Sequence, residues 1–188
     1  MFARTERLLL RPGWREDASA LAAAIGDEGI IRNLARAPWP YAETDAAQFL
    51  ERVQESALTQ FLIFSRTLGA PRLVGGCGIM QDGTDLELGY WIARPYWGLG
   101  FATEASRAVV QIARAMNLPK LKAGHFLDNP ASGNVLRKIG FRPTGRVSLR
   151  YSRGRGEQAP SALFEEGELV EMRPNLSAAL YLDQALAA

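Results

Sequence analysis

The sequence feature that most constrains the fold is a glycine-bearing stretch between a run of strand character and a run of helix character. It reads RPYWGLGFATE over residues 94–104, after an alternating run at 86–92 and before helically spaced apolar residues at 102–116. Gly98 and Gly100 allow a left-handed backbone and leave room for a ligand to come close. The next helix would begin with unpaired N–H groups and the positive end of its dipole at this point, which is the usual geometry of a phosphate site. A plain strand-to-helix turn is the alternative, because short glycine motifs match by chance.

The composition is that of an ordinary globular protein. The chain has 188 residues, of which 47% are apolar and 22% charged, and we expect residues 1–188 to form one domain. The net charge of +2 gives no argument for binding nucleic acid. No apolar stretch is long enough to span a membrane and no signal-peptide pattern is found, so we expect a cytoplasmic protein without a membrane partner. Cys77 is the only cysteine and lies in an apolar run, which favours a buried inert thiol over a nucleophile.

The first part of the chain reads as one short strand followed by helices. The apolar run 7–11 stops at Pro12 and Gly13, which indicates a buried strand. Asp17 suits the N-cap of an alanine-rich helix that extends to Ile25. We then expect a short helix over 27–34, a proline-containing loop over 38–41 and a helix over 44–58.

Three consecutive strands are expected next, over 61–67, 73–80 and 86–92. Asp82 and Gly83 are typical of a hairpin turn, so these strands form an antiparallel meander that leads into the glycine stretch.

The chain then changes from antiparallel to parallel pairing. The strand at 86–92, the helix at 102–116 and a strand at 121–127 predict a parallel pair with a right-handed connection, and ligands bind beside such a change. Asn129 fits the N-cap and Pro130 the first position of another helix, which ends at Gly140. Further strands are expected from Phe141, over 147–151 and over 159–164, with a weakly amphipathic helix or a tail at 176–188.

Two motifs together resemble the paired signature of GNAT-superfamily N-acetyltransferases. They are YWGLGFATEA at 96–105 and NPASGNVLRKIGF at 129–141, and TERLLLR at 5–11 is typical of the RimJ/RimL-like branch, which includes ribosomal-protein N-terminal acetyltransferases. The resemblance covers roughly residues 4–166. It implies a mixed α/β (α+β) GNAT-like fold. The central sheet would be mostly antiparallel, with about six or seven strands, a splayed parallel pair and helices on both faces.

The resemblance implies acetyl-CoA as the donor. Its pyrophosphate would lie on the main chain of Trp97, Gly98, Leu99, Gly100, Phe101, Ala102 and Thr103. The pantetheine arm would enter between the splayed strands and pair with the main chain of Trp91 and Ile92. Pro95 stands where the family often has Gln or Arg, which removes one side-chain contact.

The second motif adds candidate contacts with acetyl-CoA. By resemblance, Asn129 would bind the pantetheine arm or a water beside it, and an N-cap is compatible with that role. Asn134 and Lys138, with Arg137, would lie near the nucleotide end of CoA, and a solvated basic face is the alternative.

The leaving thiolate needs a proton or a hydrogen bond. Many superfamily members use a Tyr seven residues after the Asn, but this chain has Leu136 there. In the RimJ/RimL-like branch the role belongs to the Ser of the Asn-x-x-Ser motif, which is Ser132. The alternative is that Ser132 is only the third residue of a capped helix.

The attacking amine must be neutral, so a base or a chain of waters must take its proton. Glu87 and His125 are the candidates, with an exposed surface carboxylate and a structural histidine as the alternatives. Tyr90 and Asp128 are poorer candidates. A thioester is already activated, so positioning and desolvation can suffice, and we expect neither a covalent enzyme intermediate nor a metal.

The amine acceptor is the least constrained part. A peptide N-terminus, a small amine and an aminoglycoside-like antibiotic all stay open, as does a monomer or a homodimer. Four arginines of the late hairpin would attract an acidic partner or form a solvated face: Arg146, Arg150, Arg153 and Arg155. Four aromatic residues would line the acceptor groove or pack in the core: Trp39, Tyr41, Trp91 and Tyr151.

The sequence therefore predicts an acetyl-CoA-dependent N-acetyltransferase that acts on a primary amine by direct transfer in a ternary complex. One alternative is a non-catalytic acetyl-CoA or CoA-binding regulatory module, which keeps the donor site and lacks acceptor chemistry. Another is a generic nucleotide-phosphate binder, which the absent Walker lysine and the motif at 129–141 oppose.

Overall fold

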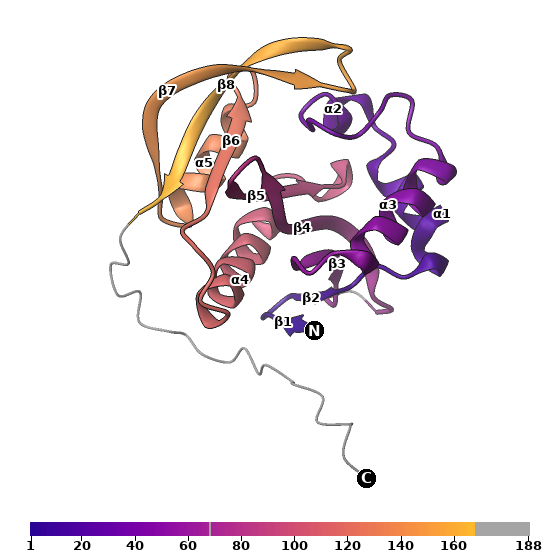
Figure 1. Cartoon of the computed structure of the whole chain (residues 1–188). Coiled ribbons are helices and arrows are strands. Elements are labelled where there is room, and N and C mark those ends of the chain that lie inside the picture. Colours follow the sequence, from indigo (N-terminus) through magenta and orange to yellow (C-terminus); the bar gives the residue numbers. More distant parts are fainter. Residues whose placement is uncertain (68, 168–188) are drawn as a thin grey trace.

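The computed structural model describes residues 1–67 and 69–167, and the segment predicted as a C-terminal helix or tail lies outside them. These residues build one mixed sheet with helices on both faces (Figure 1). The strands lie in the order β1-β2-β3-β4-β5-β6-β8-β7. Their bounds are β1 (Ala3–Arg4), β2 (Leu8–Arg11), β3 (Gln60–Ser65), β4 (Arg72–Asp82), β5 (Asp85–Ile92), β6 (Lys122–Phe126), β7 (Phe141–Ser152) and β8 (Glu157–Glu166).

The sheet has the predicted mixed character, with eight strands in the described residues rather than six or seven. The additional strand is β1, which pairs Ala3 with Leu10. It was missed because two residues are too short to show a period. The expected strands near Phe141 and at 147–151 are one strand, β7, whose register shifts between Pro143 and Val147.

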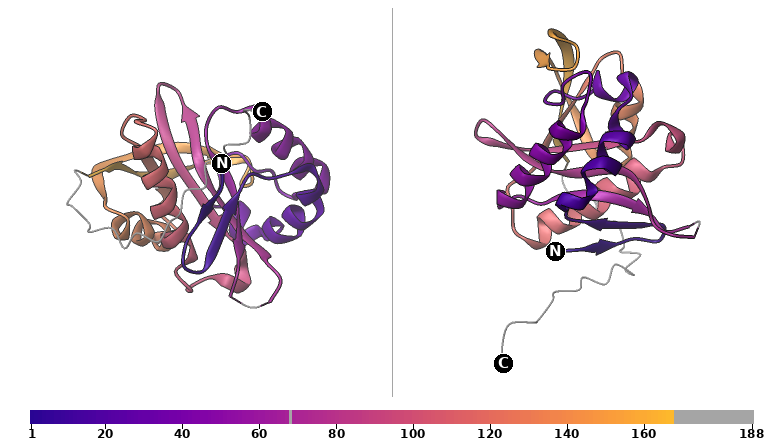
Figure 2. Two further views of the ribbon diagram at one scale, coloured as in Figure 1. Left: turned by 90° about the horizontal axis from the view of Figure 1, so that it is seen from below. Right: turned by 90° about the vertical axis from the view of Figure 1, so that its right-hand side faces the viewer.

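The helices are η1 (Arg15–Asp17), α1 (Ala18–Ile25), α2 (Glu28–Ile31), α3 (Glu43–Glu55), η2 (Arg94–Tyr96), α4 (Phe101–Ala115) and α5 (Pro130–Lys138). In the left-hand view of Figure 2, the indigo and purple helices α1 and α3 lie on one side of the central strands and the pink α4 on the other. No helix in the described ranges is long and apolar enough to cross a membrane.

The core is divided between the two faces of the sheet. On β3, Phe61 and Ile63 belong to the cluster that packs under α4, whereas Leu62 and Phe64 belong to the cluster with α1, α2 and α3. Because both faces are covered, the strand reads as a continuous apolar run and does not alternate. Cys77 is buried in the α4 cluster, as expected, and burial raises the pKa of its thiol to about 12.

Two helix starts differ from the prediction. Asp17 occupies the N-cap position of α1, but its side chain makes no cap hydrogen bond. Its carboxylate instead accepts from both terminal nitrogens of Arg11, each at 2.7 Å, and from the Trp14 N–H at 2.8 Å. Helix α3 begins at Glu43, where Asp45 accepts from the Ala42 N–H at 3.0 Å. The half-buried Arg11 thus binds the Asp17 carboxylate that the sequence assigned to a simple cap.

Candidate active site

The glycine stretch has the predicted geometry. Gly98 and Gly100 both have φ of 80°, and Gly100 is the N-cap of α4. Since glycine has no side chain, no side-chain oxygen caps the first N–H groups of α4. A Cβ added at Gly98 would meet nothing within 4 Å, and Leu99 is half exposed. The loop therefore presents uncapped N–H groups at an open helix N-terminus, which suits an anion.

The N-terminal segment holds this loop in place. Glu104 in the first turn of α4 accepts hydrogen bonds from the Thr5 hydroxyl at 2.5 Å, the Arg7 N–H at 2.9 Å and the Arg7 Nε at 2.7 Å. The Arg7 guanidinium also donates to the Leu99 carbonyl oxygen at 2.9 Å. Burial acts to raise the pKa of Glu104, but the hydrogen bonds from Thr5 and Arg7 and the charge of Arg7 outweigh it and lower that pKa. The motif at 5–11 was noted in the sequence, but its contact with Glu104 depends on tertiary packing and was missed.

The parallel pair separates at its first residues. Strands β5 and β6 pair only at Glu87 and Lys122. Beyond this point β6 pairs with β8 alone. The rest of β5 pairs with β4 on its other edge. The gap that the family resemblance implied is therefore present beside residues 88–92.

The end of β5 is linked to the glycine loop. The Trp97 indole N–H donates to the Ile92 carbonyl oxygen at 2.7 Å, which leaves this carbonyl one further acceptor position. The Trp91 side chain packs against the α1–α3 cluster, and its ring leaves no room for a side chain at Gly76. Of the two residues predicted to pair with the pantetheine arm, Ile92 thus already accepts one hydrogen bond.

Helix α5 begins as expected from the second motif. The Asn129 side chain accepts from the Ser132 N–H at 3.4 Å, and Pro130 opens the helix. The Tyr90 phenol reaches from β5 to this first turn, where its oxygen lies 2.9 Å from the Ser132 carbonyl oxygen and 2.8 Å from Ser132 Oγ. Leu136 is fully buried, so the position of the tyrosine in other superfamily members faces the core here. The contact of Tyr90 with Ser132 gave no signal in the sequence, because 42 residues separate the two.

Glu87 is not an exposed surface carboxylate, and that alternative is wrong. Its exposure is 7%, and both carboxylate oxygens accept from the Arg150 guanidinium of β7. The hydrogen bond from Arg150 to Glu87 raises the pKa of Arg150 despite its burial, so the guanidinium stays charged. The alternative that all four late arginines form a solvated face also fails at Arg150.

His125 on β6 lies against the start of α5. Its Nδ1 is 2.9 Å from the Phe126 carbonyl oxygen, which can only accept, so Nδ1 carries a hydrogen. A Cβ at Gly133 would stand 2.6 Å from Nε2, so the ring is close to the residue after Ser132. In the neutral ring Nε2 is then an acceptor.

The hairpin of β7 and β8 arches toward α2 (Figure 1) and closes one side of the molecule. Ser152 Oγ donates to the Leu34 carbonyl oxygen, and the Arg153 N–H to that of Ala35, both at 2.9 Å. Arg155 binds the Asp128 carboxylate through two nitrogens at 2.8 and 2.9 Å. Asp128, a poorer candidate for the base, is therefore held in a salt bridge.

The remaining residues predicted to contact acetyl-CoA lie on the exposed face of α5. Asn134 and Lys138 are exposed, and the Lys138 carbonyl oxygen accepts from Arg107 of α4 at 2.9 Å. Arg107 and Lys138 thus form a basic edge between α4 and α5, whereas the Arg137 guanidinium lies over the Phe164 ring of β8.

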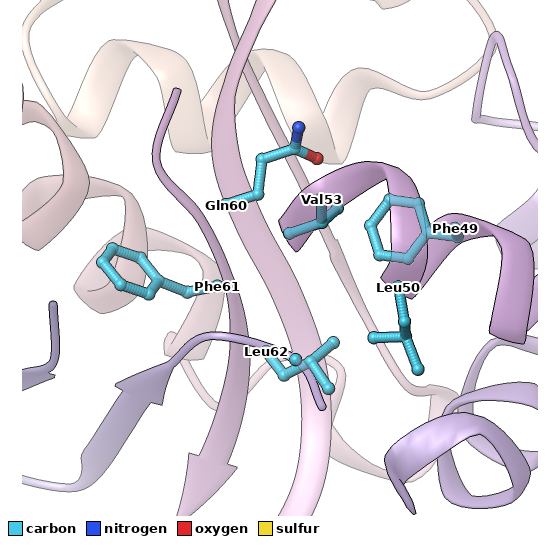
Figure 3. A pocket seen from close by; sticks show the side chains of 7 residues that line it. Phe49, Leu50, Val53, Gln60, Phe61 and Leu62 are labelled. Carbon is cyan, nitrogen blue, oxygen red and sulfur yellow. The ribbon is translucent and has the colours of Figure 1, made fainter. Parts of the chain in front are cut away.

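A separate hollow between α3 and β3 is shown in Figure 3. It is lined mainly by apolar residues: Gly13, Phe49, Leu50, Val53, Gln60, Phe61 and Leu62. None of these belongs to the glycine loop or to the start of α5, so the hollow is not part of the candidate site.

Together, fold and site define a mixed-sheet domain with a phosphate-type loop beside a splayed parallel pair. A family model described as the acetyltransferase (GNAT) domain matches residues 7–142, and the chain belongs to this acetyltransferase family. This confirms the family and the enzyme class predicted from the sequence.

Known proteins resemble the chain over most of its length. The uncharacterized N-acetyltransferase p20 of Bacillus licheniformis is 28% identical over 171 residues, covering 85% of this chain and 92% of p20. A crystal structure of a GNAT-family acetyltransferase from Bacillus anthracis has a TM-score of 0.74 at 24% identity, covering 88% of this chain and 97% of that one. RimL, a ribosomal L7/L12 α-N-protein acetyltransferase in complex with coenzyme A, has a TM-score of 0.71 at 16% identity, covering 86% and 94%. The latter two show that the fold is shared.

Proposed function

We propose that this protein transfers the acetyl group of acetyl-CoA to a primary amine, directly and within a ternary complex. The observation that carries the proposal is the left-handed glycine loop at the uncapped start of α4, beside a parallel pair that separates after one residue pair. The GNAT family match and the coenzyme A bound to the structurally similar RimL support this donor.

The donor would lie across the splayed strands. Its pyrophosphate would accept from the main-chain N–H groups of residues 98–103, because the Trp97 N–H already donates to the Arg94 carbonyl oxygen at 3.2 Å. Its pantetheine arm would run beside Trp91 and Ile92 toward Asn129. Asn134 and Lys138, on the basic edge with Arg107, would meet the nucleotide end. Electrostatic attraction between this basic edge and the phosphates of the nucleotide supports this orientation of acetyl-CoA.

Ser132 would act on the leaving group. The amine nitrogen attacks the thioester carbon, a proton leaves the nitrogen, and the C–S bond breaks to release the CoA thiolate. A hydrogen bond from Ser132 Oγ would stabilise that thiolate as charge develops on it. The position of Ser132 in the first turn of α5, at the open end of the gap, supports this role.

Of the two predicted bases, His125 is the better placed to accept the proton of the amine. Its Nε2 is an acceptor in the neutral ring, whereas both oxygens of Glu87 are bound to Arg150. Glu87 is buried, so it would act through water. We therefore propose His125 as the proton acceptor and Glu87 as the second candidate.

We further propose an acceptor of the RimJ/RimL type, a peptide N-terminus, because solved structures with this fold include ribosomal-protein acetyltransferases. A small amine is the competing acceptor. The non-catalytic CoA-binding module stays the alternative function, since its donor site would look the same.

The test is release of free CoA thiol from acetyl-CoA, measured with a thiol reagent in the presence of a panel of peptide N-termini and small amines. We expect amine-dependent release and an acetylated product detected by mass spectrometry. Binding of acetyl-CoA without release from any amine would favour the non-catalytic alternative.

A further inference from the structure

Tyr90 joins the two sides of the splayed gap. Its side chain starts from β5, and its hydroxyl ends 2.8 Å from Ser132 Oγ and 2.9 Å from the Ser132 carbonyl oxygen in the first turn of α5. The ring packs against the core cluster under α4, which fixes its direction. The hydroxyl therefore meets Ser132 at a set position.

The phenol stays protonated near neutral pH. Burial raises the pKa of Tyr90 well above its ordinary value, and the hydrogen bond with Ser132 offsets only part of this effect. A protonated phenol has one hydrogen to donate and can also accept. Tyr90 is too weak an acid to protonate the departing thiolate, whose conjugate thiol has an ordinary pKa of about 8.5, so it acts through hydrogen bonds and does not transfer its proton.

This single hydrogen links the Tyr90 hydroxyl to the direction of the Ser132 hydroxyl. If Tyr90 donates to the Ser132 carbonyl oxygen, then the short contact with Oγ requires Ser132 to donate to Tyr90, and the serine hydrogen is engaged by the Tyr90 oxygen. If Tyr90 instead donates to Oγ, the serine hydrogen is released for another acceptor. The two arrangements interconvert by rotation of the Tyr90 and Ser132 hydroxyl groups, and neither the tyrosine ring nor helix α5 has to move.

We propose that Tyr90 is a positioning residue for acetyl transfer, which donates to Ser132 Oγ and so directs the Ser132 hydrogen to the departing CoA sulfur. This inference rests on the proposed function. It also gives a physical reason why this chain can hold a leucine at position 136, since a tyrosine hydroxyl reaches the preceding turn of the same helix from β5.

The inference predicts a property of bound CoA that needs no amine acceptor. A hydrogen bond from Ser132 stabilises the thiolate, so CoA should bind more tightly as the pH rises through the thiol pKa of about 8.5. Desulfo-CoA lacks the sulfur and should show no such rise. Calorimetric titrations with both ligands over this pH range measure the difference.

In Tyr90→Phe the ring packing stays and the hydroxyl is lost, so the pH-dependent gain in CoA affinity should fall by about tenfold, as expected for one charge-assisted hydrogen bond. Ser132→Ala should also lose the pH-dependent gain in CoA affinity. Adding Tyr90→Phe to the Ser132→Ala protein should cause no further loss. Ser132→Thr keeps a hydroxyl and should retain the gain. Ser106→Ala, which removes a buried hydroxyl bonded to Cys77 in the same cluster, is the matched control and should behave like the unaltered protein.

Two results would overturn the inference: a Tyr90→Phe protein with the unaltered pH profile, or equal losses from Tyr90→Phe with and without Ser132. Failure of the proposed function is seen separately, as CoA and desulfo-CoA binding without any amine-dependent thiol release. If Tyr90→Phe does not fold, the contrast of Ser132→Ala with Ser132→Thr decides whether the hydroxyl bonded to Tyr90 faces the sulfur.

Discussion

Arg7 and Glu104 determine the shape of the glycine loop from two distant parts of the chain. Arg7→Ala removes the donor to the Leu99 carbonyl and two donors to Glu104. We expect acetyl-CoA to bind about tenfold more weakly, because the loop loses its fixed conformation. Arg4→Ala, at an exposed position of β1, is the control and should leave the affinity unchanged. Unchanged affinity in both variants would show that Arg7 does not shape the donor site.

The same carboxylate makes stability depend on pH. The folded-state pKa of Glu104 is lowered, so its contribution is complete above the ordinary value of 4.5 and is lost as the pH falls through the folded-state pKa. Glu104→Gln should therefore be less stable at neutral pH, and its unfolding midpoint should fall less than that of the unaltered protein as the pH drops below 4.5. Denaturant unfolding at a series of pH values measures this, and parallel curves for the two proteins would refute it.

Residue roles were the part of the site that sequence predicted least. The positions of Ser132 and Asn129 followed from a motif, and both lie at the start of α5 as expected. The burial of Glu87 did not follow, because alternation places it opposite Leu88 but does not show that β7 brings Arg150 over that face. Pairs such as Tyr90 and Ser132 arise only when separate elements pack.

At the scale of elements, the start of α5 combines a cap with a proposed ligand contact, and two substitutions separate them. Asn129→Ala should cost about 1 kcal/mol of stability through the lost cap. Asn129→Asp keeps the capping oxygen but removes the amide N–H₂ donor. We expect Asn129→Asp to unfold like the unaltered protein and to bind acetyl-CoA more weakly. If Asn129→Asp binds acetyl-CoA normally, Asn129 is a cap alone.

Elements with a strong period were predictable, and short or bulged ones were not. The apolar face of α4, with Ala105, Val109 and Ile112, is buried as expected. The β1 strand and the register shift in β7 have no period to read. Their existence depends on neighbouring strands that offer open hydrogen-bonding edges.

At the scale of the molecule, the order of antiparallel strands, glycine loop, helix and parallel strand predicted the fold class and indicated where to look for the candidate site. The contacts that close the site were not predictable, because the β7–β8 hairpin reaches α2 across more than a hundred residues, as in the bond from Ser152 to Leu34. The identity of the amine acceptor is the part of the proposed function that the sequence constrains least.

The most direct test of the account is a calorimetric titration with acetyl-CoA, with ATP as the control ligand, on the unaltered protein and two glycine variants. Gly100→Trp places a bulky side chain at the start of α4, whereas Gly83→Trp changes another positive-φ glycine with open surroundings, on the β4–β5 hairpin. We predict that acetyl-CoA binds the unaltered protein and Gly83→Trp far more tightly than ATP does, and that Gly100→Trp gives no binding heat. Equal binding of ATP, or normal acetyl-CoA binding by Gly100→Trp, would contradict the assignment of the donor site.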